Sequence, residues 1–446
     1  MSRLQLCILS ATLLLMSPTA FALGDGSVNG VDKTIDRTLV VDAEQSWHKE
    51  TRQYSRIAAT LELSGMLNES TSFTSIVRGQ ILGPNSADPG SPNQPAVSPS
   101  SQRIYINDAI ELELRELYLD MDFESASLRL GKQQVVWGQA DGLKLLDVVN
   151  PQDFRRFILD DFDDSRIPQW TVNLELFLEI GDLQLLWIPD TSMHSLPESD
   201  AEFALTAPFA NLPRGMPVLL NPIDRPDNIL EDADVGARLS MFLAGWDVTL
   251  NYLYHYDDFP VLQMHIANNQ LALSPRFERT NTIGASASNA FGNFIFRMEL
   301  AYNTDTYLAS RVQDPGNTTN VNQVTATGEL GYIFGLDWTG LSDTFVSAQL
   351  FQSHLLDGSD FSRDDVDTNL TLLVRRNFLN ESLKLELLWI YHLNADDNLL
   401  RISGDYELAS EVSMTLYADF FEGRASELFG QFDEKDQVGI RFSFGF

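Results

Sequence analysis

The chain has 446 residues, of which 63 are acidic and 30 are Lys or Arg, so its formal net charge at pH 7 is −33. A surface with this charge repels nucleic acid and anionic headgroups and attracts cations, which excludes a nucleic-acid partner. Hydrophobic residues make up 44% of the chain and aromatic residues 10%, and this content excludes an intrinsically disordered protein.

Residues 1–22 have the pattern of a secretory signal peptide. They contain one positive charge at Arg3, an apolar run from Leu4 to Met16, and small residues at Ala20 and Ala22. The apolar run is about 13 residues long, against the roughly 20 needed to span a membrane, so a membrane-anchoring helix is the less favoured alternative. The protein is therefore expected to be exported.

The single cysteine, Cys7, lies inside the predicted signal peptide. The mature chain is then expected to have no cysteine, which excludes disulfides, a thiolate nucleophile and cysteine-based metal sites. Without Arg3 it holds 29 Lys and Arg against 63 acidic residues, a net charge of −34. Export without disulfides favours a protein of the bacterial envelope, with residues 23–37 as a short N-terminal periplasmic segment.

Apolar residues then recur at every second position. Phe294, Phe296, Met298, Leu300 and Tyr302 alternate with Ile295, Arg297, Glu299 and Ala301, and the same pattern occurs at 246–254, 383–391 and 412–420. Each segment is typical of a strand with one apolar and one polar face. Long strands of this kind favour a closed transmembrane barrel, all-β and antiparallel, with lipid outside and water inside. A soluble sandwich or a periplasmic solenoid is the alternative.

The spacing of turns predicts the number of strands. Short turns are expected at 68–70, 123–126, 180–183, 243–246, 289–293, 336–343, 380–382 and 409–411, and they alternate with longer loops. Outer-membrane barrels keep short turns in the periplasm and long loops outside. Seventeen strands follow Arg56, and Thr38–Trp47 supplies the first strand that an even number requires. We expect 18 strands over residues 38–446, with 16 as the alternative.

One connection, residues 137–168, differs in kind from the mobile or mixed loops expected at 83–103, 189–234, 257–278 and 305–323. Asp141 is placed to cap a short helix over Gly142–Val149. Asn150, followed by Pro151 and with Asp153 at the third helical position, is a second helix start. That second helix would have Phe154, Phe157 and Ile158 on one face.

A helical loop with an apolar face needs a surface to pack against. We expect it to fold into the barrel and narrow the lumen, facing strand charges such as Glu116, Asp120 and Arg129; an external cap is the alternative. The residues expected to form this constriction are Trp137, Asp141, Lys144, Asp147, Asn150, Asp153, Arg155, Arg156, Asp160, Asp161, Asp163, Asp164 and Arg166.

The acidic run at Asp160, Asp161, Asp163 and Asp164 has two interpretations. Four carboxylates can hold Ca²⁺. The favoured interpretation is an acidic loop partly neutralised by Arg155, Arg156 and Arg166, and no metal or other cofactor is predicted.

The same region resembles a known family. The matching motifs are Arg115-Glu116-Leu117-Tyr118, Gly131-Lys132-Gln133, Val136-Trp137-Gly138, Asp147 to Pro151, and Asp164-Ser165-Arg166. They are similar to those of an uncharacterised, porin-like family of proteobacterial outer-membrane barrels, known mainly as a domain of unknown function. The resemblance implies an outer-membrane lipoprotein and an inner-membrane exporter as partners for moving a hydrophobic or bulky molecule. It brings no catalytic residues.

The last ten residues, QVGIRFSFGF, place Val438, Ile440, Phe442, Phe444 and Phe446 on one face. They resemble the C-terminal signal read by the barrel assembly machinery, with Gln437, Gly439, Phe442 and Phe444 in its polar, glycine and aromatic places and Phe446 at the terminus. The barrel assembly machinery, outer-membrane lipids and lipopolysaccharide are therefore expected partners.

The six histidines, at 48, 194, 255, 265, 354 and 392, have no metal-ligand spacing. His194 and Ser195 are adjacent, as are Ser353 and His354, and chance adjacency is favoured over a catalytic pair in both cases. The leading hypothesis is a channel or transporter barrel of the outer membrane that passes a small or hydrophobic solute, and not an enzyme. A structural or adhesive barrel with a blocked lumen and, less favoured, a barrel hydrolase are the alternatives.

Overall fold

A computed structural model describes residues 35–49, 51–83, 94–206, 217–267, 270–309, 324–357, 361 and 363–446. The predicted signal peptide lies outside these residues, as does most of segment 23–37. Parts of the four loops expected at 83–103, 189–234, 257–278 and 305–323 also lie outside them.

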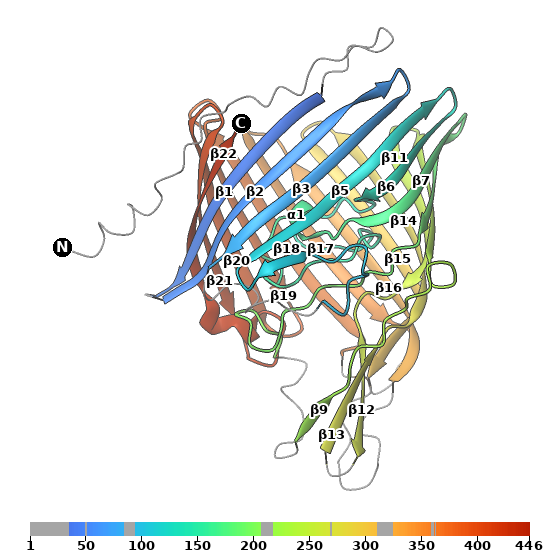
Figure 1. The fold of residues 1–446 in the computed structure, drawn as a ribbon, viewed down its shortest axis with the longest axis vertical. Coiled ribbons are helices and arrows are strands. Elements are labelled where there is room, and N and C mark those ends of the chain that lie inside the picture. The colour runs from blue at the N-terminus through green and yellow to red at the C-terminus, as the bar shows by residue number, and fades with distance from the viewer. Residues whose placement is uncertain are drawn as a thin grey trace, which may run out of the picture.

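Eighteen strands form one closed antiparallel barrel (Figure 1). They are β1 (Ile35–His48), β2 (Thr51–Asn68), β3 (Thr71–Leu82), β5 (Ile110–Phe123), β6 (Ala126–Gln133), β7 (Gln169–Leu178), β8 (Gly181–Ile188), β10 (Asp234–Leu243), β11 (Trp246–Tyr256), β14 (Arg279–Phe291), β15 (Phe294–Ala309), β16 (Val324–Trp338), β17 (Thr344–Leu355), β18 (Val366–Phe378), β19 (Leu383–His392), β20 (Asp397–Ala409), β21 (Val412–Glu422) and β22 (Gln437–Gly445). Each pairs with the next around the ring, and β22 closes the ring on β1 from Trp47↔Val438 to Val40↔Gly445. The predicted number of strands is confirmed, and the predicted first strand lies within β1.

In the described parts of the connections lie four further strands and two short helices. β4 (Ile104–Asn107) pairs only with β5, at the end of that strand. β9 (Val218–Leu220), β12 (Val261–Ala267) and β13 (Gln270–Arg276) form a separate three-stranded sheet that projects beyond the barrel (Figure 1). The described helices are α1 (Phe162–Ser165) and the 3₁₀ helix η2 (Gly430–Lys435). No described helix has the length and apolar character needed to cross a membrane.

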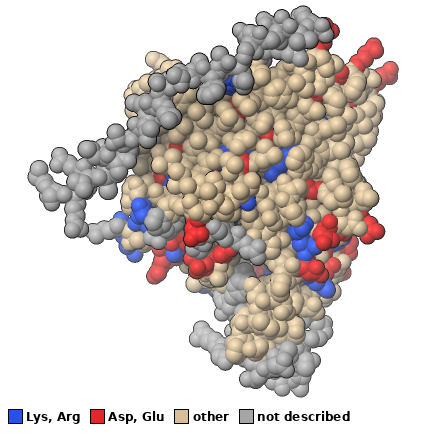
Figure 2. Space-filling view, viewed as in Figure 1, with Lys and Arg blue, Asp and Glu red and all other residues tan. Residues whose placement is uncertain are grey.

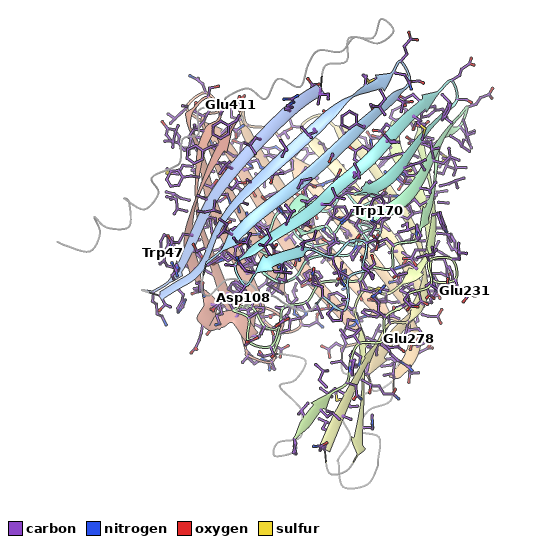
Figure 3. The ribbon with its side chains drawn as sticks, viewed as in Figure 1. Trp47, Asp108, Trp170, Glu231, Glu278 and Glu411 are labelled. Atoms are coloured by element: carbon purple, nitrogen blue, oxygen red, sulfur yellow. The ribbon has the colours of Figure 1, made fainter. Side chains whose placement is uncertain are left out.

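The eight predicted short turns are confirmed, and all join strands at one end of the barrel, which we call the turn end. β1 begins and β22 finishes at this end (Figure 1). One of the two-residue turns joins β10 to β11 through Ala244 and Gly245, whose φ angles of 51° and 92° are those a hairpin turn of this length favours. The longer connections lie at the opposite end, the loop end, together with the short connections from β1 to β2 and from β19 to β20. Figure 3 labels Glu411 at the turn end and Trp47, Asp108, Glu231 and Glu278 towards the loop end.

The strands are apolar outside and polar inside, the reverse of a soluble protein. On β15, Met298 and Leu300 are 38% and 46% exposed, whereas Glu299 between them is 4% exposed. On β11, Leu250 and Tyr252 are exposed while Asn251 is buried. Figure 2 shows charged side chains gathered towards the two ends of one face and sparse across its middle. This pattern suits a wall with hydrocarbon outside and polar groups inside.

Candidate functional site

The segment between β6 and β7, residues 134–168, leaves the wall at Gln133 and returns at Gln169. It has no helix over 142–149 or 150–158, so the predicted pair of helices was wrong; the only helix in it is the four-residue α1. We call residues 134–168 the β6–β7 segment.

The predicted cap residues Asp141 and Asn150 do not cap helices, because their side chains accept hydrogen bonds from other parts of the chain. The Asp141 carboxylate accepts hydrogen bonds from Gln349 Nε2 at 3.0 Å and from Arg297. Asn150 Oδ1 accepts from the backbone N–H of Val135 at 2.7 Å. Phe157 has a φ of 55°, which a right-handed helix cannot contain.

The first part of the segment packs against β14, β15 and β16. Glu299 on β15 accepts hydrogen bonds from the backbone N–H groups of Gln139 (2.5 Å) and Leu146 (3.2 Å). Because Glu299 lies between outward-facing Met298 and Leu300, these contacts are on the inward face of the wall.

Two glycines of the wall make room for leucines of the segment. A Cβ on Gly331 of β16 would lie 2.6 Å from Leu145 Cδ1, and a Cβ on Gly284 of β14 would overlap Leu146 Cδ2. Any side chain at either position would therefore have to displace the segment. Glycine inside a strand is a signal of close approach by another part of the chain, and it was present in the sequence.

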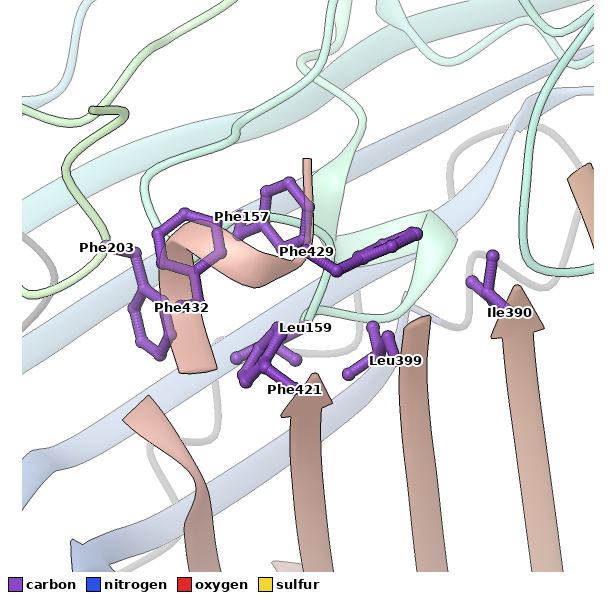
Figure 4. Close-up of a cluster of buried hydrophobic side chains, with 8 residues drawn as sticks. All are labelled: Phe157, Leu159, Phe203, Ile390, Leu399, Phe421, Phe429 and Phe432. Carbon is purple, nitrogen blue, oxygen red and sulfur yellow. The ribbon is translucent and has the colours of Figure 1, made fainter. Parts of the chain in front are cut away.

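The middle of the segment reaches the opposite wall. Arg156 donates to Glu44 of β1 at 3.1 Å, and its guanidinium lies 3.9 Å from the ring centroid of Tyr54 on β2. Phe157 belongs to a buried cluster that β19, β20, β21 and η2 complete (Figure 4). The cluster residues are Phe157, Leu159, Phe203, Ile390, Leu399, Phe421, Phe429 and Phe432.

The four aspartates of the acidic run each lie near a different arginine. The pairs are Asp160–Arg156 (2.7 Å), Asp161–Arg441 (3.9 Å), Asp163–Arg166 (2.6 Å) and Asp164–Arg78 (2.9 Å). These contacts favour neutralisation over Ca²⁺ binding, and no group of acidic or histidine side chains suited to a metal occurs in the described part of the chain. Arg155, expected among the neutralising residues, pairs instead with Asp153 at 3.0 Å.

The remaining predicted constriction residues also have partners in or near the segment. Asp147 pairs with Arg166 at 2.8 Å and with Lys144 at 3.2 Å. Trp137 Nε1 donates to Gln184 of β8 at 2.7 Å. Each of the predicted residues thus has a partner in the segment or on the wall, and the segment contacts β15 on one side and β1 on the opposite side. Of the strand charges expected to face it, Arg129 and Asp120 instead pair with each other at 2.6 Å.

Burial and ion pairing set the protonation of the segment. Burial alone would raise the pKa of Asp153, but Arg155 and Arg103 hold that pKa below its usual range. Burial lowers the pKa of Lys144 to about 8, against the opposing charge of Asp147. Asp153 is therefore charged at neutral pH, while Lys144 is close to titrating.

A cavity of about 400 Å³, open to solvent, lies between the segment and strands β2 and β3. It is lined on the wall side by Tyr54, Arg56, Arg78, Gln80 and Leu82, and on the segment side by Asp153, Arg155, Arg156, Asp160 and Asp164. A smaller cavity of about 190 Å³ lies beside Gly138, Lys144 and Arg166. The larger one is bordered by charges of both signs.

Comparison with known proteins agrees with this architecture. The family model described as "Protein of unknown function (DUF1302)" matches residues 68–186 and 190–443. The chain belongs to this family. No curated protein matches it.

Solved structures similar to this DUF1302 chain include three barrels. OccAB1 of Acinetobacter baumannii has a TM-score of 0.52 at 9% identity, with 95% of this chain and 98% of that chain covered. OccK8 (OprE) of Pseudomonas aeruginosa has a TM-score of 0.51 at 10% identity, with 93% of this chain and 98% of that chain covered. OccAB3 of A. baumannii has a TM-score of 0.51 at 8% identity, with 93% of this chain and 99% of that chain covered. At these identities the likeness shows the porin-like barrel fold.

The C-terminal strand of the DUF1302 chain has internal reasons for its residues. Gln437 donates to Asp419 at 2.8 Å, and Gly439 lies directly against the ring of Tyr417, so that a Cβ there would overlap it. Phe442 and Phe444 lie opposite Ala43 and Val41 of β1, and Phe446 exchanges backbone hydrogen bonds with Leu39. The strand closes the barrel; recognition by the assembly machinery stays a prediction.

The histidines of the DUF1302 chain have individual structural partners. His194 Nδ1 accepts from the backbone N–H of Gln152 at 2.8 Å, and His392 lies between Asp367 and Asp397. Ser353 donates to Glu329 at 2.5 Å, not to neighbouring His354. Among the hydrogen bonds of the described residues, no histidine joins a serine and a carboxylate in a catalytic arrangement.

Sequence reasoning missed the wall residues that hold the segment. These are Glu44, Arg78, Arg115, Arg297 and Glu299 in the strands, and Arg103 just before β4. Their signal was charge at the inward positions of alternating strands, but alternation alone does not say which strands lie across the lumen from one another.

Proposed function

We propose that this protein is a channel-type barrel of the bacterial outer membrane, with the β6–β7 segment folded across its lumen as the constriction. The observation that carries the proposal is the set of contacts just described. One part of the segment binds Glu299 of β15, and another binds Glu44 of β1, both on the inward face of the wall. A segment tied to opposite walls narrows a lumen that 18 strands would otherwise leave wide.

The solute path that we propose is the 400 Å³ cavity between the segment and β2–β3. Arginines and aspartates face it together, so it favours small polar solutes over apolar ones. The acidic excess of the chain, −33, predicts a weak preference for cations in the wider parts of the lumen.

The topology supports an orientation. We propose that residues 1–22 are removed as an export signal and that the turn end faces the periplasm, because short turns of such barrels lie there. Lipopolysaccharide, the barrel assembly machinery, an outer-membrane lipoprotein and an inner-membrane exporter are then the proposed partners.

Single-channel currents in planar bilayers test the path. Gln80 lines the cavity, whereas its neighbour Ile81 is 50% exposed on the outward face. Gln80→Trp should lower the conductance at least severalfold, and Ile81→Trp should leave it unchanged. Equal conductance of the two variants would contradict passage through this cavity.

A structural or adhesive barrel is the second candidate, and the projecting sheet favours it. Val218, Leu219 and Leu220 on β9 are all exposed, which is the kind of apolar surface that binds partners. Loss of cell binding on deleting the β8–β10 connection, with solute permeability unchanged, would favour this function over a channel.

A further inference from the structure

The barrel wall has a gap in its strand pairing beside β5. On its β6 side, β5 pairs with β6 from Phe123 to Leu117 and with β4 only from Leu112 to Ile110, so residues 113–116 have no partner strand among the described ladder pairs. The first three residues of β7 similarly extend beyond its last pair with β8, Val172↔Trp187. The gap arises because the chain leaves the wall after Gln133.

An irregular segment, residues 94–101, lies beside the ends of β6 and β7 at this gap, where Lys132 Nζ of β6 lies 3.5 Å from Ser101 O; we call it the strap. Backbone N–H of Met193 donates to Ala96 O at 2.8 Å, and Trp170 Nε1 of β7 donates to Ser100 O at 3.3 Å. Trp170, labelled in Figure 3, marks the place on the wall. Val97, Ser98 and Ser101 of the strap are each at most 5% exposed. The strap is therefore buried at the place where the strand pairing stops.

One carboxylate holds the strap. Asp190 Oδ1 accepts hydrogen bonds from Ser98 Oγ (2.6 Å), Ser192 Oγ (2.6 Å) and Ser192 N (3.1 Å), while Oδ2 accepts from Ser101 Oγ (2.5 Å) and Trp170 N (3.2 Å). Asp190 itself is 3% exposed. These bonds satisfy polar groups that lipid could not. All of them end on one side chain and none belongs to a strand ladder, so they can be broken locally.

Next to the strap the lumen face is apolar instead of polar. Leu186 and Ile188 of β8 and Leu253 of β11 are buried on the inward face with Val135 and Trp137 of the β6–β7 segment. The interior of such barrels is ordinarily polar. Ile188 of this cluster precedes by two positions Asp190, which binds the strap, so the apolar surface ends close to the strap's anchor.

The outer side of the gap is apolar too. Ile104 and Ile106 on β4 are 63% and 67% exposed, and Leu112 on β5 is 38% exposed. The strap therefore lies near an apolar part of the lumen face, and the neighbouring β4 and β5 have an apolar outer surface.

We propose that the strap is a displaceable panel of the wall, and that a solute with an apolar body passes sideways through this gap between the lumen and the surrounding lipid. The inference rests on the proposed channel function, because the solute enters the lumen first. It gives the barrel a second path, for apolar solutes, besides the charged cavity beside β2 and β3.

A disulfide can lock the panel. Ser98 Oγ and Ser192 Oγ lie 3.3 Å apart, close enough for a cystine after small adjustments, and residues 94–206 contain no cysteine that would compete. The probe is 1-N-phenylnaphthylamine, an apolar dye that fluoresces in lipid, added to cells whose outer membrane excludes it. Ser98→Cys with Ser192→Cys, oxidised, should reduce dye entry to the level of cells without the barrel, and a reductant should restore it.

A second variant loosens the panel. Asp190→Ala removes the acceptor of both strap hydrogen bonds and should raise dye entry by at least about tenfold, since losing even one hydrogen bond to a charged group has about that effect. Asp120→Ala, which removes a carboxylate of the wall that pairs with Arg129, is the control and should leave dye entry unchanged.

Planar-bilayer currents of the same variants separate the two proposals. Dye entry that is indifferent to both the cystine and Asp190→Ala overturns the sideways path, even where ion currents show an open channel. Absent ion currents in every variant, with dye entry still controlled by the cystine, overturn the axial channel and keep the sideways path.

Discussion

Arg156 of the β6–β7 segment and Glu44 of β1, 112 positions apart in the chain, form a buried ion pair of 3.1 Å with side chains 5% and 1% exposed. Glu44 also accepts from Tyr417 at 2.7 Å and lies 3.3 Å from Arg56. The segment is thus anchored to a carboxylate that the wall itself holds in place.

Removing the arginine should loosen the segment. Arg156→Ala leaves Glu44 buried with fewer partners, and breaking a buried ion pair costs about 3–5 kcal/mol. Thermal unfolding of the purified barrel should show this loss, towards the lower value because Arg56 remains. The matched control is Arg129→Ala, whose half-exposed pair with Asp120 should cost about 0–1 kcal/mol. Equal losses in the two variants would show that Arg156 does not anchor the segment.

A substitution at a glycine of the wall should displace the β6–β7 segment without changing the sequence of that segment. Gly284→Val would place a side chain where Leu146 now lies, and overpacking of this kind costs about 1–3 kcal/mol. Proteolysis should then cut the segment faster while the strands stay protected. Gly335→Ala on β16 meets only ordinary contacts, with its nearest neighbour at 3.4 Å, and should change nothing. Unchanged proteolysis of the Gly284 variant would contradict the packing.

Acid should weaken the contacts around His194. Burial lowers the pKa of His194 to about 3, and its neutral Nδ1 accepts a hydrogen bond from Gln152 N. Asp258 Oδ2 lies 3.9 Å from that Nδ1. Burial and the nearby Asp234 and Asp257 raise the pKa of Asp258. The pKa of His194 in the folded protein lies below its value of 6.5 in the unfolded chain. Between pH 6.5 and about pH 3 the unfolded state therefore binds more protons than the folded state. The stability from His194 is complete above pH 6.5 and falls as the pH drops towards 3.

The size of the acid effect follows from the pKa difference. At pH 4 the loss should be about 2–4 kcal/mol for this group. His194→Gln keeps a polar acceptor and removes the titration, so the difference in melting temperature between wild type and variant should change between pH 7 and pH 4. Parallel pH profiles would rule out His194 as the cause.

The last strand should depend on one glycine. Gly439→Ala would force Tyr417 away from Glu44, so we expect a loss of about 1–3 kcal/mol and slower barrel closure. Refolding into detergent, followed by the far-UV signal of the sheet, measures both. If Gly439→Ala refolds normally in detergent but fails to assemble in cells, the glycine acts through recognition by the assembly machinery rather than through Tyr417.

The wall was predictable from sequence because its signal is local. Alternation with period two places Met298 outside and Glu299 inside without knowledge of any other strand, and turn chemistry at Ala244-Gly245 marks the strand ends. The number of strands followed from these two signals.

The conformation of the β6–β7 segment was not predictable in the same way. Asp141 and Asn150 have the side chains of helix caps, but Gln349 and Val135 satisfy them first. Val135 is near Asn150 in the chain, but Gln349 for Asp141 and Glu44 for Arg156 come into place only when the ring closes. Local propensity therefore predicted helices, whereas tertiary contacts across the lumen hold the backbone of the segment in an irregular conformation.

The most direct test of the account is the single-channel conductance of a variant that lacks Gly142–Asp163, compared with wild type in the same planar bilayer. The account predicts that the folded variant conducts severalfold more current and loses its ion preference, because the constriction is gone. A folded variant that conducts no more than the wild type would contradict the claim that this segment controls the lumen.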